Sequence, residues 1–436
     1  MKNNNIRPLY FADEIFYWAR IGKQPTVLEI QCTLTEKADP RVLESAFLNA
    51  LKVHTNFRIR PVIVNSKFMA MVEDVTAVPV YPKDDKVRQL ATSDTEGLLL
   101  YIVYEDNEID LHIFHGLSDF RGIIAFINTM LKFYYSETGQ LDCELPEPDS
   151  ADTTPCFEDI VAQGAPGTPL GLFIPEEDKV FHLPEENFGK RTTRQHICEI
   201  DVPLDPLLAL SRGSESSVVP TLQAFIGRAI RKTYDVGDKD VIGYTPVDLR
   251  PIFRFETSGN ASSNFPIRYS EALDRHDLNE RAMMLRSFLD LQIQPENLYA
   301  RVKGVMEKVK PVIEAPLPLD IQTHMIVDGG RKIDRASYTY GISYAGKVCF
   351  DEEIRKHVTS VTGCAASYSY PVWILAAEIN GIIRLVFTQN YDSVTLVQNI
   401  CRELSEEIPG TCFKDWGHHE FDEFHLYKIK RMHNLI

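Results

Sequence analysis

The chain has 436 residues, of which 44% are hydrophobic and 25% are charged, as in an ordinary globular protein. One hydrophobic core seldom serves a chain of this length, so we expect two structural units. The net charge of -16 argues against a nucleic-acid groove or an anionic membrane surface as the main partner, because both would repel the protein.

The first 140 residues predict a mixed α/β unit, the N-terminal lobe. Alternating apolar residues indicate strands, and apolar residues that recur at intervals of three and four indicate helices. The predicted elements of this unit are strands at 26–33, 57–64, 68–72, 98–104 and 109–114, and helices over 40–54 and from residue 120 onward.

Residues 141–190 are rich in proline, glycine and acidic residues and show no sustained period, which predicts a long crossover linker between two lobes. Residues 191–436 then predict a C-terminal lobe. Its expected strands lie at 195–202, 240–251, 337–343, 370–379 and 382–388, and its helices over 278–291 and 296–312 and from residues 220 and 394. Asn380 and Gly381 give a strong hairpin signal between the last two strands. Each lobe therefore has the elements for a mixed sheet with helices packed on it.

Eight cysteines are scattered between Cys32 and Cys412 without a Cys-x-x-Cys pair, which favours reduced core thiols over a disulfide framework. The sequence begins without a signal-peptide pattern, and no run of about 18 apolar residues occurs. We therefore expect a soluble, cytoplasmic, monomeric protein without a membrane span.

His115 and Asp119 form a His-x-x-x-Asp motif at the point where a predicted strand passes into a predicted helix. The short buried strand delivers His115 into a tight turn, and Ser118 or Asp119 is placed to cap the helix. The spacing itself carries little weight, since 12 histidines should give on the order of one such pair by chance. The context of the motif is what favours an active site.

Two other pairs have the same spacing. His324 and Asp328 are followed by polar residues rather than an amphipathic helix, and His418 and Asp422 lie in a charged tail without a clear strand signal. The tail, residues 415–425, holds possible metal ligands but lacks His-Glu-x-x-His spacing, so we expect a solvated surface and assign no metal site. A metal hydrolase that uses these histidines is the weakest alternative.

The order of these segments resembles the chloramphenicol acetyltransferase-like superfamily, which includes condensation domains of peptide synthetases, alcohol acetyltransferases and plant acyltransferases. Residues 50–58 are similar to the first helix of that family and the strand after it. Residues 115–119 match its catalytic motif, 247–250 resemble its strand-end arginine segment, and 342–348 resemble its Ser-Asn-x-Gly segment. The resemblance covers nearly the whole chain and implies a two-lobed α/β fold with an active site at the lobe interface.

Two departures from the family pattern bear on function. Condensation domains usually carry a second histidine before the motif and a glycine after it, whereas this chain has Phe114 and Phe120 there. This difference favours a stand-alone acyltransferase. Tyr344 stands where the family often has asparagine. If that asparagine donates a hydrogen bond to the oxyanion, the hydroxyl of Ser343 or Tyr344 replaces it here, or this chain lacks the donor. An ordinary strand end before a turn explains these two residues equally well.

The resemblance implies that an acyl group moves from a thioester to a hydroxyl or amine acceptor, with His115 as general base. A neutral imidazole can take the acceptor's proton near pH 7. Asp119 is expected to face away from the substrate and to fix the turn through a bidentate pair with Arg250.

Four further residues are candidate substrate contacts. Gly116 and Gly346 lie in the two matched segments, and Asn390 and Tyr391 end the predicted hairpin. The last two either reach the cleft or form a turn that caps the last helix.

No bound cofactor is required, because the thioester of acyl-CoA or of an acyl carrier protein is a co-substrate. Given the acidic balance of the chain, a local group of lysines and arginines would have to receive the donor. The alternative function is a catalytically inactive two-lobed protein that binds a ligand in the cleft, since a fold does not fix a function. Its main support is Phe120 and Tyr344. The acyl donor and the acceptor stay open.

Overall fold

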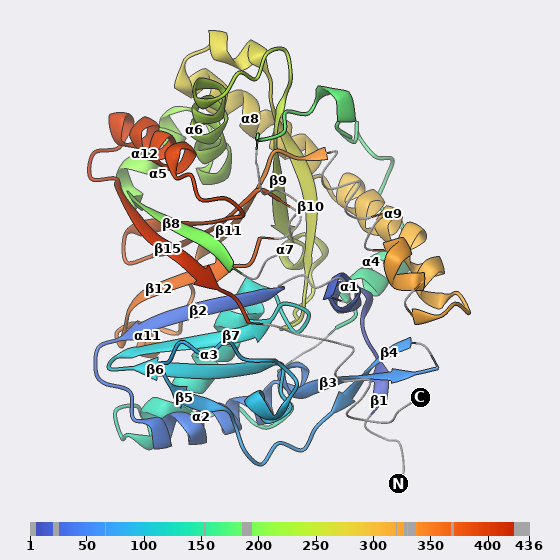
Figure 1. Cartoon of the computed structure of the whole chain (residues 1–436), viewed down its shortest axis with the longest axis vertical. Helices are drawn as coiled ribbons and strands as arrows, with labels where there is room; N and C mark the ends of the chain where they lie inside the picture. Colours follow the sequence, from blue (N-terminus) through green and yellow to red (C-terminus); the bar gives the residue numbers. More distant parts are fainter. Residues whose placement is uncertain are drawn as a thin grey trace.

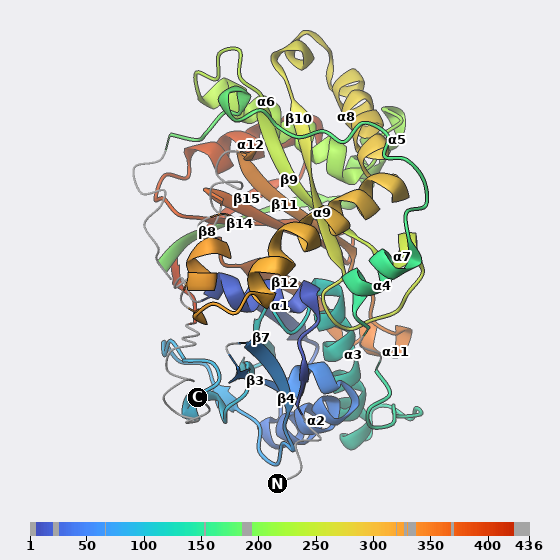
Figure 2. The same ribbon diagram turned by 90° about the vertical axis from the view of Figure 1, so that its right-hand side faces the viewer.

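The computed structural model describes residues 6–20, 26–65, 67–151, 154–184, 194–319, 321–326, 329, 337–367 and 370–422. Over these residues the chain forms two lobes, each with its own β-sheet and helices packed on it (Figures 1 and 2). One hydrophobic cluster runs through both lobes. The predicted two-lobed α/β architecture is confirmed.

The N-terminal lobe contains a five-stranded sheet in the order β12-β2-β7-β6-β5. Helices α2 and α3 pack together on one face of it (Figure 1). Helix α2 begins at Pro40 because the Asp39 carboxylate accepts hydrogen bonds from two backbone N–H groups of its first turn. A three-stranded sheet, β1-β4-β3, adjoins the lobe. The bounds are β1 (Ile6–Pro8), α1 (Phe11–Arg20), β2 (Val27–Leu34), α2 (Pro40–Val53), β3 (Ile59–Val64), β4 (Lys67–Val72), β5 (Val80–Pro82), β6 (Leu100–Glu105), β7 (Glu108–Phe114), α3 (Phe120–Glu137) and β12 (Val358–Ala365).

The C-terminal lobe contains a seven-stranded sheet in the order β10-β9-β11-β13-β14-β8-β15. Asn380 and Gly381 both have positive φ angles and close the β13–β14 hairpin as predicted. Helices α5, α6, α8 and α12 gather at the end of this lobe that is remote from the other (Figure 1). The bounds are β8 (Arg194–Pro203), α5 (Leu204–Gly213), α6 (Val218–Thr233), β9 (Val241–Asp248), α7 (Arg250–Phe253), β10 (Ser262–Tyr269), α8 (Leu278–Gln292), α9 (Pro295–Glu314), β11 (Tyr340–Lys347), α11 (Glu352–Arg355), β13 (Val372–Ile379), β14 (Ile382–Gln389), α12 (Thr395–Glu407) and β15 (Cys412–Glu420).

The predicted lobe boundary does not hold for β12. This strand comes from the C-terminal part of the chain but pairs antiparallel with β2, so it completes the sheet of the N-terminal lobe. Its small and polar residues give a weak alternating pattern, and only the partner strand defines it. The predicted crossover linker also differs from a structureless segment, because it contains α4 (Cys156–Gln163), which contacts α9.

The predicted tail is a solvated surface over most of its described length, because residues 412–420 are largely exposed, but the absence of a strand there is wrong. Residues 412–420 form β15, an edge strand that pairs antiparallel with β8. Its apolar pattern is faint because one edge of the strand is free and most of its side chains are polar. Asp422, two residues after the strand, is 2% exposed. Asp328 and the polar residues 331–335 lie outside the described residues.

No described helix combines the length and the apolar character that crossing a membrane requires.

Candidate active site

The predicted strand–turn–helix around His115 is confirmed. β7 ends at Phe114, and the His115 N–H then donates to the Thr26 carbonyl over 2.8 Å. Asp119 caps α3, because its carboxylate accepts the Gly122 N–H at 3.1 Å. A Cβ at Gly116 would overlap the Phe114 ring, so only glycine fits there. Gly116 therefore serves the turn and is absent from the residues that line the cavity described below.

A buried amide from the N-terminal lobe holds the other side of the turn. Asn56 Nδ2 donates to the carbonyls of Leu117 (3.0 Å) and Ser258 (3.2 Å). The Ser118 hydroxyl also donates to the Ser258 carbonyl, over 2.6 Å. Asn56 belongs to the segment 50–58 that resembles the family's first helix and the strand after it. The turn is thus fixed by groups from both lobes.

Asp119 pairs with Arg250 as predicted, but the pair is not bidentate. Arg250 Nη2 lies 2.9 Å from Asp119 Oδ1, while Nη1 bonds Asp248 at 3.0 Å and Nε bonds the Thr257 carbonyl at 2.9 Å. The second Asp119 oxygen accepts the Ala261 N–H at 3.0 Å. The guanidinium is shared among several acceptors because Asp248 and the loop after α7 compete for its N–H groups. With both its oxygens bonded, Asp119 suits a structural role.

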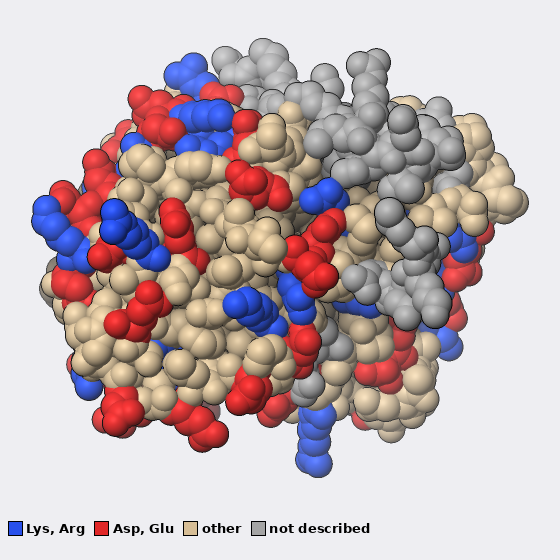
Figure 3. Space-filling model, turned by 90° about the horizontal axis from the view of Figure 1, so that it is seen from below, with Lys and Arg blue, Asp and Glu red and all other residues tan. Residues whose placement is uncertain are grey.

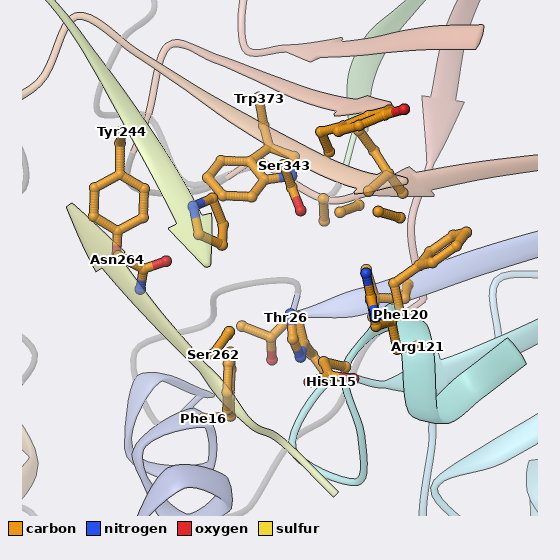
Figure 4. A pocket seen from close by; sticks show the side chains of 18 of the residues that line it. Phe16, Thr26, His115, Phe120, Arg121, Tyr244, Ser262, Asn264, Ser343 and Trp373 are labelled. Carbon is orange, nitrogen blue, oxygen red and sulfur yellow. The ribbon is translucent and has the colours of Figure 1, made fainter. Parts of the chain in front are cut away.

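The imidazole of His115 points into a cavity of about 300 Å³ between the two lobes (Figure 4). The floor includes Phe16 and Thr26, and Ser343 and Trp373 come from the C-terminal sheet above (Figure 4). The cavity thus combines side chains of both lobes, as the resemblance implies. Its lining consists of Phe16, Thr26, Val27, Leu28, His115, Asp119, Phe120, Arg121, Tyr244, Pro246, Asp248, Arg250, Ser262, Asn264, Ser343, Tyr344, Ala345, Ala365, Ala366, Ser367, Tyr370, Trp373 and Leu375.

The environment of His115 favours the neutral imidazole. Its ring stacks on Phe16 with centroids 4.2 Å apart, and its Nδ1 is buried, which leaves Nε2 as the nitrogen that a substrate can reach. Burial lowers the pKa of His115 below its ordinary value, because the charged form loses solvation. A neutral imidazole with one accessible nitrogen can accept a proton at neutral pH.

Two residues behind the turn were not found from the sequence. Asn260 Nδ2 donates to the His115 carbonyl (2.9 Å) and to Asp13 Oδ1 (2.8 Å), so α1 and the loop before β10 both support the histidine backbone. Burial raises the pKa of Asp13 to about 7. No local pattern could identify this contact, because Asp13 and Asn260 are joined only by the fold.

The predicted residues of β11 reach the cavity, and the predicted glycine beside them does not. Ser343 and Tyr344 line the wall opposite His115, where burial raises the pKa of Tyr344 to about 12. The phenol therefore keeps its proton and can donate a hydrogen bond. Gly346 has a φ of 75° and lies at the irregularity in β11 between Tyr344 and Lys347.

Asn390 and Tyr391 support a turn rather than the cavity. The Asn390 amide donates to the Tyr370 carbonyl (3.0 Å) and accepts from Gln195 (2.8 Å). The Tyr391 carbonyl accepts from Gln389 over 2.9 Å. Neither of these residues lines the cavity, so the alternative interpretation of a turn before the last helix fits better.

The charged residues of the lining are paired with one another. Arg121 lies 3.1 Å from Asp248, and Arg250 bonds both Asp248 and Asp119. The remainder is apolar, aromatic or neutral and polar. A group bound in this cavity would therefore meet no uncompensated charge from the lining, which suits an uncharged reacting group.

Aromatic rings form the wall across from His115. The Tyr370 ring lies 4.9 Å from Tyr244 and 5.3 Å from Trp373. The indole crosses β11 at Gly341, where a Cβ would overlap it. The absence of a side chain at Gly341 therefore sets how far Trp373 extends into the cavity.

Substituting Gly341→Ala should displace the Trp373 ring and change the size selectivity of the cavity. We expect KM to rise several-fold for the bulkiest accepted substrates and little for the smallest, as measured by initial rates over a size series. Gly304→Ala is the matched control, because no atom lies within 4 Å of the added Cβ in α9. A uniform effect on substrates of all sizes would contradict the assignment.

No family model matches the chain, and no curated protein matches it. Solved structures do. Polyketide synthase associated protein 5 from Mycobacterium tuberculosis is 14% identical, with a TM-score of 0.60 over 92% of this chain and 98% of that one. The condensation domain of the monacolin K polyketide synthase is also 14% identical, with a TM-score of 0.61 and coverages of 92% and 97%. The trichothecene 15-O-acetyltransferase from Fusarium sporotrichioides is 13% identical, with a TM-score of 0.58 and coverages of 92% and 95%.

Proposed function

We propose that this chain, which has the two-lobed chloramphenicol acetyltransferase-like fold predicted from its sequence, is an acyltransferase. It would move an acyl group from a thioester to a hydroxyl or amine acceptor. The observation that carries the proposal is the imidazole of His115, which a turn held by hydrogen bonds from Asn56 and Asn260 presents to a cavity shared by both lobes.

The reaction needs one proton acceptor and a donor to the oxyanion. His115 Nε2 takes the proton as the acceptor's oxygen or nitrogen forms a bond to the thioester carbonyl carbon. The carbon–sulfur bond then breaks, and the thiolate receives the proton from the imidazolium. Ser343 and Tyr344 are the candidate donors to the oxyanion, because both residues carry a hydroxyl and line the opposite wall.

The donor is either acyl-CoA or the thioester of an acyl carrier protein. Figure 3 shows acidic and basic side chains interspersed on one face of the molecule, so the net charge of -16 is not concentrated there. The negatively charged part of the donor, a nucleotide or a carrier protein, would stay outside the cavity. Only the uncharged thioester and the acceptor would enter the cavity and meet His115.

A panel of thioesters and acceptors tests the proposal. Acyl-CoAs and short thioesters without the nucleotide are mixed with the protein and with alcohols or amines, and free thiol and acylated product are measured. Thiol release that depends on the acceptor and equals the product formed supports acyl transfer. Saturable ligand binding without turnover on any pair would instead favour the inactive binding protein.

The pH dependence of activity should report the depressed pKa of His115. Since burial lowers this pKa, the base stays neutral to a lower pH than an exposed histidine. We expect kcat/KM to be constant near neutrality and to fall on acidification with a midpoint below 6.5. Circular dichroism over the same pH range checks that the fold is retained, and a midpoint above 6.5 contradicts the assigned environment.

A further inference from the structure

A second cluster of titratable side chains lies where the C-terminal segment returns to the N-terminal lobe. Glu29 of β2 and His112 of β7 stand directly opposite each other in the sheet. β15 ends beside this sheet (Figure 1), and it brings His419 and the nearby Asp422 to the same place. The cluster lies outside the cavity, because none of these four residues is among those that line it.

Ligand atoms of Glu29, His112 and Asp422 lie within 4.8 Å of one another, and His419 lies beside Glu29. His112 Nδ1 lies 2.8 Å from Asp422 Oδ2 and 3.5 Å from Glu29 Oε1, and His419 Nε2 lies 2.8 Å from Glu29 Oε2. Four ligands around a tetrahedral Zn²⁺ with bonds of about 2.0–2.1 Å stand roughly 3.3 Å from one another. The spacing therefore approaches that of a metal site, and three of the four side chains are at least 87% buried.

Further groups hold two of these side chains in place. The Tyr101 hydroxyl donates to Asp422 Oδ2 over 2.6 Å, and the Arg88 N–H donates to Oδ1 over 2.7 Å. The Tyr101 ring stacks on His112 with centroids 4.5 Å apart. Hydrogen bonds and packing of this kind orient metal ligands in known sites.

Hydrogen bonding alone leaves part of the cluster unsatisfied. His112 Nδ1 carries at most one proton, which Asp422 accepts, and Glu29 Oε1 is buried without a hydrogen-bond partner. His419 Nε2 is also buried and lacks one, although it lies close to Glu29 Oε2. A carboxylate oxygen and an imidazole nitrogen in one buried cluster thus both have an unused lone pair or proton.

We propose that Glu29, His112, His419 and Asp422 bind a divalent transition-metal ion of the Zn²⁺ type. Two imidazole nitrogens and two carboxylates are ligands that zinc accepts. Four protein ligands leave no open position for a substrate, so the site is structural. The ion would connect the end of β15 to the sheet of the N-terminal lobe. The segment from His419 to Asp422 would then help to hold the two lobes together.

The charge balance is compatible with the exchange of protons for a metal. His112 faces the carboxylate of Asp422, and His419 faces that of Glu29. Without metal, two imidazolium groups can balance two carboxylates. A divalent cation bound to two neutral imidazoles gives the same net charge, with two protons released.

The test uses the full chain, stripped with a chelator and titrated with Zn²⁺ in competition with a chromophoric chelator. We expect one tightly bound equivalent, a higher melting temperature with zinc than without, and an intense visible spectrum typical of four-coordinate Co²⁺ after substitution. His419→Gln should lower the affinity at least tenfold. Its side chain is 36% exposed, so the variant should fold, which circular dichroism checks.

His418→Gln is the matched control. This neighbour on β15 contacts Asp392 at 3.2 Å and belongs to a separate group with His196 and Asp392. It should keep the full affinity for zinc. The proposal is overturned if the wild-type protein binds no stoichiometric zinc, if His419→Gln binds as tightly as wild type, or if the loss appears in His418→Gln instead.

Discussion

Replacing His115 by alanine should lower the rate of acyl transfer by about 10²–10⁴-fold, the usual contribution of a general base. The residual rate would come from substrate positioning and oxyanion stabilisation, which the other residues of the cavity provide. The fold should survive, because the lost side chain is half-buried at the cavity edge and its main packing partner is the Phe16 ring. Initial rates of thiol release and thermal unfolding measure the two effects separately.

His324→Ala is the matched control for this prediction. His324 also precedes an aspartate by four residues, but it is exposed and remote in sequence from the turn that presents His115. Its loss should leave the rate unchanged. Equal rates for wild type and His115→Ala would remove the general base and favour the inactive binding protein, whereas a loss in both variants would point to a nonspecific effect of the substitutions.

The parts of the site that the sequence predicted are those encoded locally. The strand, the turn and the capped helix around His115 depend on neighbouring residues, and so does the hairpin at Asn380-Gly381. The contact between Asp119 and Arg250 came from the family resemblance, since 130 intervening residues separate its partners. Its bidentate form was wrong because Asp248 takes part of the guanidinium, a competition that only the folded loop reveals.

The parts that were missed depend on pairing between distant segments. β15 is mostly polar and the apolar residues of β12 are small, and each segment becomes a strand because a partner strand supplies hydrogen bonds. Asn260 reaches the His115 carbonyl only because the loop before β10 folds over the turn. Similarly, the structure favours the turn over the cleft for Asn390 because its amide bonds Gln195 and the Tyr370 carbonyl. Sequence patterns predict burial and local geometry, but they do not predict which buried side chains from distant segments come into contact.

Replacing Asp119 by alanine should destabilise the protein by about 3–5 kcal/mol, because it leaves the largely buried Arg250 guanidinium without one of its two carboxylates. The same change removes the cap of α3 and the acceptor of the Ala261 N–H. Activity should fall together with stability, since the turn that carries His115 loses its anchor. Denaturant unfolding and initial rates measured at a temperature where the variant is folded provide the two values.

Two further variants test the structural role of Asp119 even if Asp119→Ala does not fold. Asp119→Asn keeps one acceptor oxygen for the cap and should retain more stability and more activity than the alanine variant. Asp106→Ala removes an ion pair with Lys37 in which both side chains are more than two-thirds exposed, and solvent screening should make its effect undetectable. An Asp119 variant that unfolds like wild type and is nevertheless inactive would contradict the structural role, because the carboxylate would then act on the substrate and not on the turn.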